Sequence, residues 1–139
     1  MTDPTDRFFD AINRKDMDAL AATVHPDFEM IVPQKPARGF KGKGQEVANI
    51  RYLCESHPDL VLTVLRKARS GDEIWTEASL RAGNLEMAAV TIWTIHPETD
   101  TLLSGRYYSE PVQHEAPDID TFMRSLADGG GAKPGVASV

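Results

Sequence analysis

The sequence has one cysteine, no long hydrophobic run and no recognisable leader. Cys54 stands alone among 139 residues, so neither a disulfide within the chain nor a cysteine-based metal site can form. No apolar stretch approaches the ~18 residues that a membrane-spanning helix needs. The first residues are polar and acidic, unlike those of a signal peptide. We therefore expect a cytoplasmic protein with no membrane partner.

Positive charge is also scarce. Fifteen lysines and arginines stand against 21 aspartates and glutamates, which gives a formal net charge of −6. Nucleic-acid binding depends on clustered cations that contact phosphates. The local exception, in a glycine- and proline-rich segment, consists of Lys35, Arg38, Lys41 and Lys43. The charge balance predicts no nucleic-acid partner, and the length predicts a single domain.

The chain lacks the short motifs that mark common enzyme classes. It has no glycine-rich phosphate loop, no nucleophile elbow and no histidine cluster with metal-ligand spacing. Its four histidines each fall in a loop or near the end of a predicted element, which favours surface or capping roles: His25, His57, His96 and His114. The sequence predicts no metal ion and no cofactor.

What the chain does contain is a change of hydrophobic period near residue 60. Before it, apolar residues recur at helical spacing, and Asp3 and Asp16 are suited to cap two short helices within the first 25 residues. A third helix is predicted over 45–56. The predicted strands are a short one over 28–32 and four longer ones over 60–69, 73–82, 85–95 and 101–112.

The order of these elements predicts the fold class. The four later strands follow one another through short links, one of them the two-residue hairpin Gly83-Asn84, so an antiparallel meander is expected. Early helices and late strands favour an α+β domain in which helices cover one face of a bent sheet and leave a pocket at one end. We place this domain at 1–113, an extension with an amphipathic helix at 114–126, and a flexible tail at 127–139.

Strand alternation selects the candidate site residues. The groups that share one predicted face are Ser104, Arg106, Tyr108 and Glu110 in the last strand, and Trp75, Glu77 and Ser79 in the second of the four. If this face lines a cavity, it brings a cation, a phenol and a carboxylate together. If it faces solvent, Glu77 and Arg106 form a surface ion pair of little energetic weight. Alternation alone leaves both interpretations open.

The strand over 85–95 is apolar on both faces. One face carries Leu85, Met87, Ala89, Thr91, Trp93 and Ile95, and the other carries Ala88, Val90 and Ile92. A strand of this kind is covered on both sides. The helices supply one cover, and we expect a second copy of the chain to supply the other, in a homodimer packed sheet to sheet.

Several segments, in order, resemble the SnoaL-like polyketide cyclase branch of the nuclear-transport-factor-2-like superfamily. They are the helical segment 7–20, His25-Pro26-Asp27-Phe28, Gly39-Phe40-Lys41-Gly42, Ser56-His57-Pro58-Asp59-Leu60 and Gly105-Arg106-Tyr107-Tyr108-Ser109-Glu110-Pro111. The resemblance covers roughly residues 6–113. It implies a cone-shaped, mainly antiparallel sheet wrapped around N-terminal helices, enclosing an apolar pocket, and a dimer.

The resemblance also implies an orientation of the sheet and roles for its residues. It places Trp75, Glu77, Ser79, Met87, Ala89, Thr91, Arg106 and Tyr108 toward the pocket. Glu77 or Glu110 would then move protons, while Arg106 and Tyr108 stabilise oxyanion character. The expected substrate-binding residues are Met30, Trp75, Ser79, Met87, Thr91 and Trp93.

Two activities of the superfamily can be compared with this chain residue by residue. The ketosteroid isomerase pattern needs a tyrosine and two aspartates, and the matching positions hold Phe8, Val32 and Thr91. The epoxide hydrolases use an Asp-Arg-Asp set, and the arginine and glutamates here do not match its positions. Three interpretations therefore remain: an acid–base enzyme on a small hydrophobic carbonyl or polyketide-like compound, a non-catalytic carrier of such a ligand, and a pairing module.

Overall fold

A curved sheet and three helices form the body of the protein. The structure, a computed structural model, describes residues 2–129. The helices are α1 (Pro4–Arg14), α2 (Met17–Thr23), α3 (Lys43–Ser56) and a distant α4 (Ile119–Ala127). The strands are β1 (Val24–Ile31), β2 (Phe40–Lys41), β3 (Val61–Ser70), β4 (Glu73–Ala82), β5 (Leu85–His96) and β6 (Thr101–Pro111). A short 3-10 turn, Pro36–Arg38, precedes β2.

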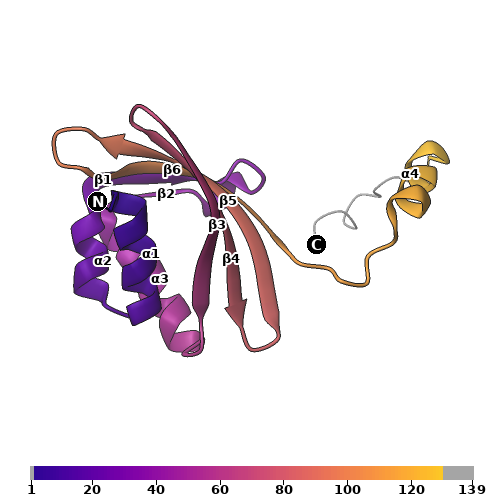
Figure 1. Ribbon diagram of the computed structural model, residues 1–139, viewed down its shortest axis with the longest axis horizontal. Coiled ribbons are helices and arrows are strands. Elements are labelled where there is room, and N and C mark those ends of the chain that lie inside the picture. Colours follow the sequence, from indigo (N-terminus) through magenta and orange to yellow (C-terminus); the bar gives the residue numbers. More distant parts are fainter. Residues whose placement is uncertain (1, 130–139) are drawn as a thin grey trace.

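The sheet is mainly antiparallel. Its strand order is β2-β1-β6-β5-β4-β3, and β1 and β6 form its parallel pair. Helices α1, α2 and α3 lie on the concave side of the sheet (Figure 1). The α+β class and the curved sheet around N-terminal helices are therefore confirmed. So is the β4–β5 hairpin, in which Ala82 pairs with Leu85 and Gly83 takes a φ of 58°.

The predicted helix caps are present. The Asp3 side chain accepts hydrogen bonds from the backbone of Thr5 and Asp6, and the Asp6 side chain accepts one from the Asp3 backbone. Asp16 caps α2 by accepting from the Ala19 backbone. These bonds satisfy amide groups that the first helical turn leaves free, so local sequence fixes where both helices begin.

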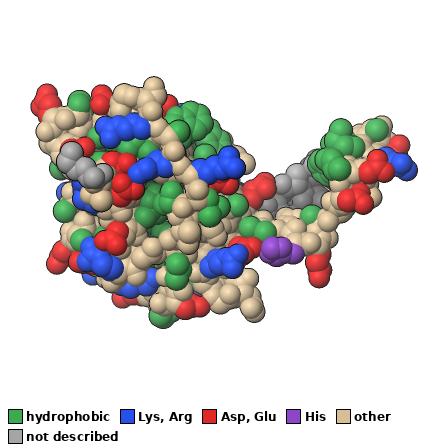
Figure 2. Space-filling view, in the orientation of Figure 1, with side chains coloured by type: hydrophobic (Ala, Val, Ile, Leu, Met, Phe, Trp, Pro, Cys, Tyr) green, Lys and Arg blue, Asp and Glu red, His purple; other side chains and the backbone are tan. Residues whose placement is uncertain are grey.

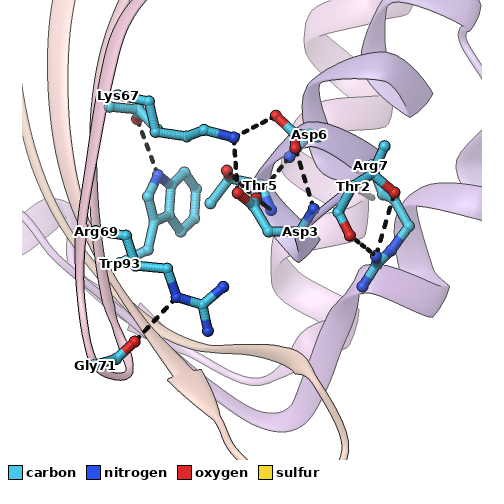
Figure 3. A network of polar contacts seen from close by, with 10 residues as sticks. Thr2, Asp3, Thr5, Asp6, Arg7, Lys67, Arg69, Gly71 and Trp93 are labelled. Atoms are coloured by element: carbon cyan, nitrogen blue, oxygen red, sulfur yellow. Dashed lines mark hydrogen bonds and ion pairs between the residues drawn. The ribbon is translucent and has the colours of Figure 1, made fainter.

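Lys67 fastens the start of α1 to β3. Its Nζ lies 2.7 Å from Asp3 Oδ2 and 2.6 Å from Asp6 Oδ1, and all three residues meet between the helix and the strand (Figure 3). Burial alone would raise the pKa of Asp3, but hydrogen bonds from Lys67 and Thr5 hold that pKa below its ordinary value. This contact joins segments more than 60 residues apart in the chain.

Trp93 lies at the centre of the core, between α1 and the concave face. Its ring packs against Phe8, with ring centroids 5.1 Å apart, and against Phe9 and Phe28. Its indole nitrogen donates to Thr76 Oγ1 at 3.0 Å, so the buried polar atom is satisfied. The core thus fills the space near Trp93 and leaves the cavity described below toward α3.

The glycine- and proline-rich segment before α3 contains regular structure. It contains the 3-10 turn and β2, which pairs with β1 through Glu29–Lys41 and Met30–Phe40. Strand β1 also begins earlier than predicted, at Val24. Its register with β6 shifts between Val24 and Glu29, so Pro26, which has no amide hydrogen, falls in the irregular part of the pairing.

Helix α4 stands apart from the body on an extended linker (Figures 1 and 2). The amphipathic helix predicted within the extension 114–126 is present as Ile119–Ala127, capped by Asp118. Its apolar side chains, Ile119, Phe122, Met123 and Leu126, are each exposed by 46% or more. The predicted flexible tail lies outside the described residues from position 130 onward. Among residues 2–129, no helix is both long and apolar enough to cross a membrane.

Candidate functional site

A cavity of about 270 Å³ lies between the concave face of the sheet and helices α1 and α3. This volume is close to the lower end of the ~300–1,000 Å³ that small-molecule sites occupy. Its walls are mostly apolar and come from every layer of the body: Phe8, Phe9, Ile12, Met30, Val32, Phe40, Ile50, Leu53, Leu62, Ala78, Leu80, Ala89 and Trp93. A site of this shape suits a small ligand with an apolar body.

Among the described residues 2–129, Glu46 is the one acidic residue that lines this cavity. It lies near the start of α3, four residues before Ile50 and seven before Leu53, so the helix carries it on the face that packs inward. The residue is 3% exposed, and its Oε2 has no hydrogen-bond partner within residues 2–129. Burial raises the pKa of this carboxyl from 4.5 to about 7.

The other polar groups of the lining are hydroxyls, cations and the amide of Gln34. Thr91 and Tyr107 are cross-strand neighbours on β5 and β6 and both line the cavity. Lys35 and Arg38 line it from the segment around the 3-10 turn, and both are exposed. The cavity therefore combines a buried carboxyl, a phenol and two cations with apolar walls.

Comparison with known proteins shows the family. The model of the SnoaL-like domain matches residues 5–102 of the chain. The chain belongs to the SnoaL-like family. The predicted resemblance to the SnoaL-like family is thereby confirmed over residues 5–102. No curated protein matches this SnoaL-like chain.

Solved structures share its fold at low sequence identity. A Kribbella flavida protein, named provisionally as a ketosteroid isomerase, is 17% identical with a TM-score of 0.69, covering 85% of this chain and 83% of its own. A Shewanella denitrificans protein, named provisionally as a SnoaL-like polyketide cyclase, is 14% identical with a TM-score of 0.65, covering 90% and 95%. A SnoaL-like protein of unknown function from Burkholderia thailandensis is 20% identical with a TM-score of 0.65, covering 76% and 90%.

In this SnoaL-like fold, Glu77 and Tyr108 lie on the convex face of the sheet. Arg66, Glu77, Val90 and Tyr108 form one row across β3 to β6, and cross-strand partners share a face. Glu77 Oε1 is 3.9 Å from Arg66 Nε, a loose surface contact. The expectation that Glu77 and Tyr108 line the pocket is corrected, because the cavity lies on the other face. Their chemical roles stay a prediction that this geometry does not favour.

The remaining groups predicted for the same face are also displaced from the cavity. Trp75 is 46% exposed, and its indole nitrogen donates to Glu73. Ser79 and Glu110 both pair with Ala88, so they lie on the convex face as well. Arg106 is exposed and lines a separate recess with Glu29 and Lys41, beside β1 and β2. The structure therefore does not bring Glu77, Glu110, Arg106 and Tyr108 into one cavity.

Other predicted binding residues are where we expected them. Met30, Thr91 and Trp93 line the cavity, and so does Ala89. Met87 shares the face of Ala89 on β5 but lies beyond the lining, where it pairs with Pro111 near the end of β6. The orientation expected for β5 is thus correct, while that expected for β4 and β6 is off by one residue.

The predicted chemical groups are nevertheless present, supplied by neighbouring or distant residues. The phenol is that of Tyr107 rather than Tyr108, and the carboxyl is that of Glu46 rather than Glu77. A signal for Glu46 exists in the sequence, because it continues the apolar spacing of Ile50 and Leu53 back by one turn.

The histidines do not contribute to this cavity. His25 and His96 stack on each other with ring centroids 4.7 Å apart, and His114 Nε2 lies 2.8 Å from Glu86 Oε1. Within residues 2–129, no group of three or more His, Cys, Asp or Glu side chains is arranged to hold a metal ion. The polar chemistry at the cavity is that of the carboxyl, hydroxyl and cationic groups above.

Proposed function

We propose that the protein binds a small hydrophobic carbonyl or polyketide-like compound in the cavity and moves a proton on it with Glu46. The observation that carries this proposal is a buried carboxyl, on an apolar cavity wall, whose Oε2 has no hydrogen-bond partner in the part of the chain that the structure describes. A pKa of about 7 leaves both the acid and the carboxylate form of Glu46 populated at neutral pH. A general acid–base group is most effective when its pKa lies near the working pH.

The proton transfer can be written for a ketone in the cavity. The Glu46 carboxylate takes a proton from the carbon next to the carbonyl, and the bonding electrons move to the carbonyl oxygen as the enolate forms. Hydroxyl donors on the opposite wall, Thr91 and Tyr107, are suited to stabilise that oxygen. Returning the proton to carbon or to oxygen regenerates Glu46, so the step needs no other reactant.

The residues of this cavity do not support ketosteroid isomerase activity, the activity for which the Kribbella flavida neighbour is provisionally named. The positions that the isomerase pattern assigns to a tyrosine and two aspartates hold Phe8, Val32 and Thr91, and all three line the cavity. None of these side chains can act as a carboxylate base. The cavity shares the place of that site in the fold, with Glu46 as its acid–base group.

Hydrogen–deuterium exchange tests the proposal directly. With 2-tetralone in D₂O at pH 8, proton NMR measures exchange next to the carbonyl. We expect the wild type to accelerate exchange and Glu46→Gln to lose that acceleration by about 10²-fold or more. Glu77→Gln, which removes a carboxylate from the convex face, is the matched control and should exchange at the wild-type rate. Equal rates for wild type and Glu46→Gln would overturn the role of Glu46.

The second candidate function is a carrier for the same kind of ligand. The enclosed, mostly apolar lining favours it, because burying an apolar ligand there needs no catalytic group. The same samples discriminate the two: a carrier binds 2-tetralone, as followed by the fluorescence of Trp93, without accelerating exchange. Pairing alone, the third interpretation, predicts that 2-tetralone does not bind.

A homodimer through the convex face is part of the proposed assembly. Support comes from apolar side chains on that face, where Trp75 and Val90 are 46% and 37% exposed. Light scattering at micromolar concentration should give twice the 15.3 kDa chain mass. A particle of single-chain mass, unchanged by Trp75→Ala, would contradict the dimer.

A further inference from the structure

The end of the cavity near the 3-10 turn is positively charged in a protein of opposite net charge. Lys35 and Arg38 line the cavity, and Arg106 and Lys41 line the adjoining recess, which shares Met30, Val32 and Phe40 with it. The chain as a whole carries a net charge of −6. Cations gathered at one opening of an acidic protein attract and orient anions there.

The two cavity cations are available to a ligand. Neither Lys35 nor Arg38 has an acidic side chain within ion-pair distance in the part of the chain that the structure describes. Three other exposed arginines, Arg14, Arg81 and Arg124, each pair with an acid at 3.2 Å or less, whereas Arg51 and Arg69 have no acidic partner within residues 2–129. What distinguishes Lys35 and Arg38 is that they both lack an acidic partner and line the cavity.

The buried part of the cavity lining supplies the second, independent observation. Glu46 is buried and unpartnered on α3, whereas Lys35 and Arg38 are exposed on the segment around the 3-10 turn. Apolar side chains such as Ile50, Leu53 and Trp93 make up most of the wall. A ligand that fits this lining has an anionic end that contacts Lys35 and Arg38 and an apolar body that packs against the cavity wall.

We infer that the natural ligand is a small apolar carboxylate, held by its carboxylate at Lys35 and Arg38 with its hydrophobic body in the cavity. The inference rests on the proposed function and names its substrate class. A guanidinium matches the two oxygens of a carboxylate with parallel N–H donors, and a lysine adds a point charge. The cavity of about 270 Å³ limits the body to about the size of one ring with a short chain or of two fused rings.

A matched pair of probes tests the carboxylate. 3-Phenylpropionate and 3-phenylpropionamide have nearly the same shape and differ in charge, and calorimetry at pH 6 measures both affinities. We expect the wild type to bind the carboxylate about tenfold more tightly than the amide, because charge-assisted hydrogen bonds are stronger than neutral ones. In the double variant Lys35→Gln/Arg38→Gln, the two affinities should agree within about twofold.

The control removes two cations away from the cavity. Arg51→Gln/Arg66→Gln makes the same change in net charge with residues that do not line the cavity, so it should keep the wild-type preference. A preference that survives Lys35→Gln/Arg38→Gln, or equal affinities in the wild type, would overturn the inference.

The outcome also separates this inference from the proposed function. Ala89→Phe fills part of the cavity. If both probes bind the wild type equally and this variant abolishes the binding of both, the cavity binds ligands and only the inference of a carboxylate fails. If neither probe binds, the inference is wrong. If 2-tetralone also fails to bind, the proposed function fails with it.

Discussion

The two faces of the sheet carry similar residue types in different surroundings. On the concave side, Trp93 of β5 and Glu46 of α3 are buried between the sheet and the helices, while on the convex face Trp75 and Glu77 are exposed. Burial holds the Trp93 ring among other aromatic rings and shifts the pKa of Glu46, whereas the Glu77 carboxylate makes a loose contact with Arg66. Residue type therefore identifies candidate site residues, and the side of the sheet on which a candidate lies determines whether it is buried and whether its pKa is shifted.

The largest expected difference between the faces is in packing. Trp93→Ala should lower the free energy of unfolding by about 3–5 kcal/mol, because it empties the centre of the core. Trp75→Ala should cost less than about 1 kcal/mol in the single chain, because the ring is half exposed. Urea unfolding measures both. The comparison is made at protein concentrations low enough to keep the chains single, and a similar cost for the two variants there would contradict the difference in packing between the two faces.

The next difference is in the pH dependence of stability. Well below pH 4.5, Glu46 is protonated in both the folded and the unfolded chain, so it contributes nothing to the pH dependence of the free energy of unfolding. As pH rises, the unfolded chain releases this proton first, so it binds fewer protons than the folded chain and unfolding becomes more favourable until about pH 7. The total loss from this group is roughly 3 kcal/mol.

Two variants isolate that contribution. Unfolding of Glu46→Gln should lack this decline between pH 4.5 and 7, while Glu77→Gln should follow the wild-type curve. Chemical denaturation at closely spaced pH values measures the three curves. An unchanged decline in Glu46→Gln would show that another group causes it.

Adjacent cations on β3 give a smaller contrast. Lys67 binds two aspartates at the start of α1, while Arg66, on the convex face, is 3.9 Å from Glu77. Lys67→Met should cost about 1 kcal/mol, because it leaves partly buried carboxylates without their cation. Arg66→Met should change stability by less than about 0.5 kcal/mol. Equal effects in thermal unfolding would contradict the role of Lys67 as the link between α1 and β3.

The smallest effect should come from removing α4. A chain ending at Ala116 should unfold within about 0.5 kcal/mol of the full chain, because α4 stands apart from the body and buries none of its residues. Differential scanning calorimetry of the two chains at one low concentration measures this. A clear loss that grows with protein concentration would instead show that α4 packs on a second copy.

Local chemistry made most of the fold predictable. Helix starts at Asp3 and Asp16 follow from capping side chains, and the β4–β5 turn follows from Gly83-Asn84. These signals act within a few residues, so a single sequence displays them. The short pairing of β2 with β1 depends on contact between two segments whose own sequences give little indication of a strand. The glycines and prolines around β2 are instead typical of a loop.

The orientation of β4 shows where the prediction of the site went wrong. Alternation divides a strand into two faces without saying which one is inside. The two-residue hairpin pairs Ala82 with Leu85, and counting back from it pairs Glu77 with Val90 rather than with a pocket residue of β5. Combining turn register with the expected orientation of β5 would have placed Glu77 on the convex face. Glu46 was missed because a lone glutamate in an early helical turn normally complements the helix dipole at the surface.

The buried thiol of α3 gives the chain an intrinsic reporter of cavity opening. Cys54 is the single cysteine and is 8% exposed, on the same helix as Glu46. Burial raises the pKa of the thiol, outweighing the lowering by nearby Lys15, so a thiol-specific reagent reacts slowly until the helix moves away. The labelling rate then measures how often α3 opens. A ligand that binds only the closed cavity would slow the labelling of Cys54 in proportion to the fraction of protein that has bound it. Ligand binding can then be measured without knowing which reaction, if any, the protein catalyses.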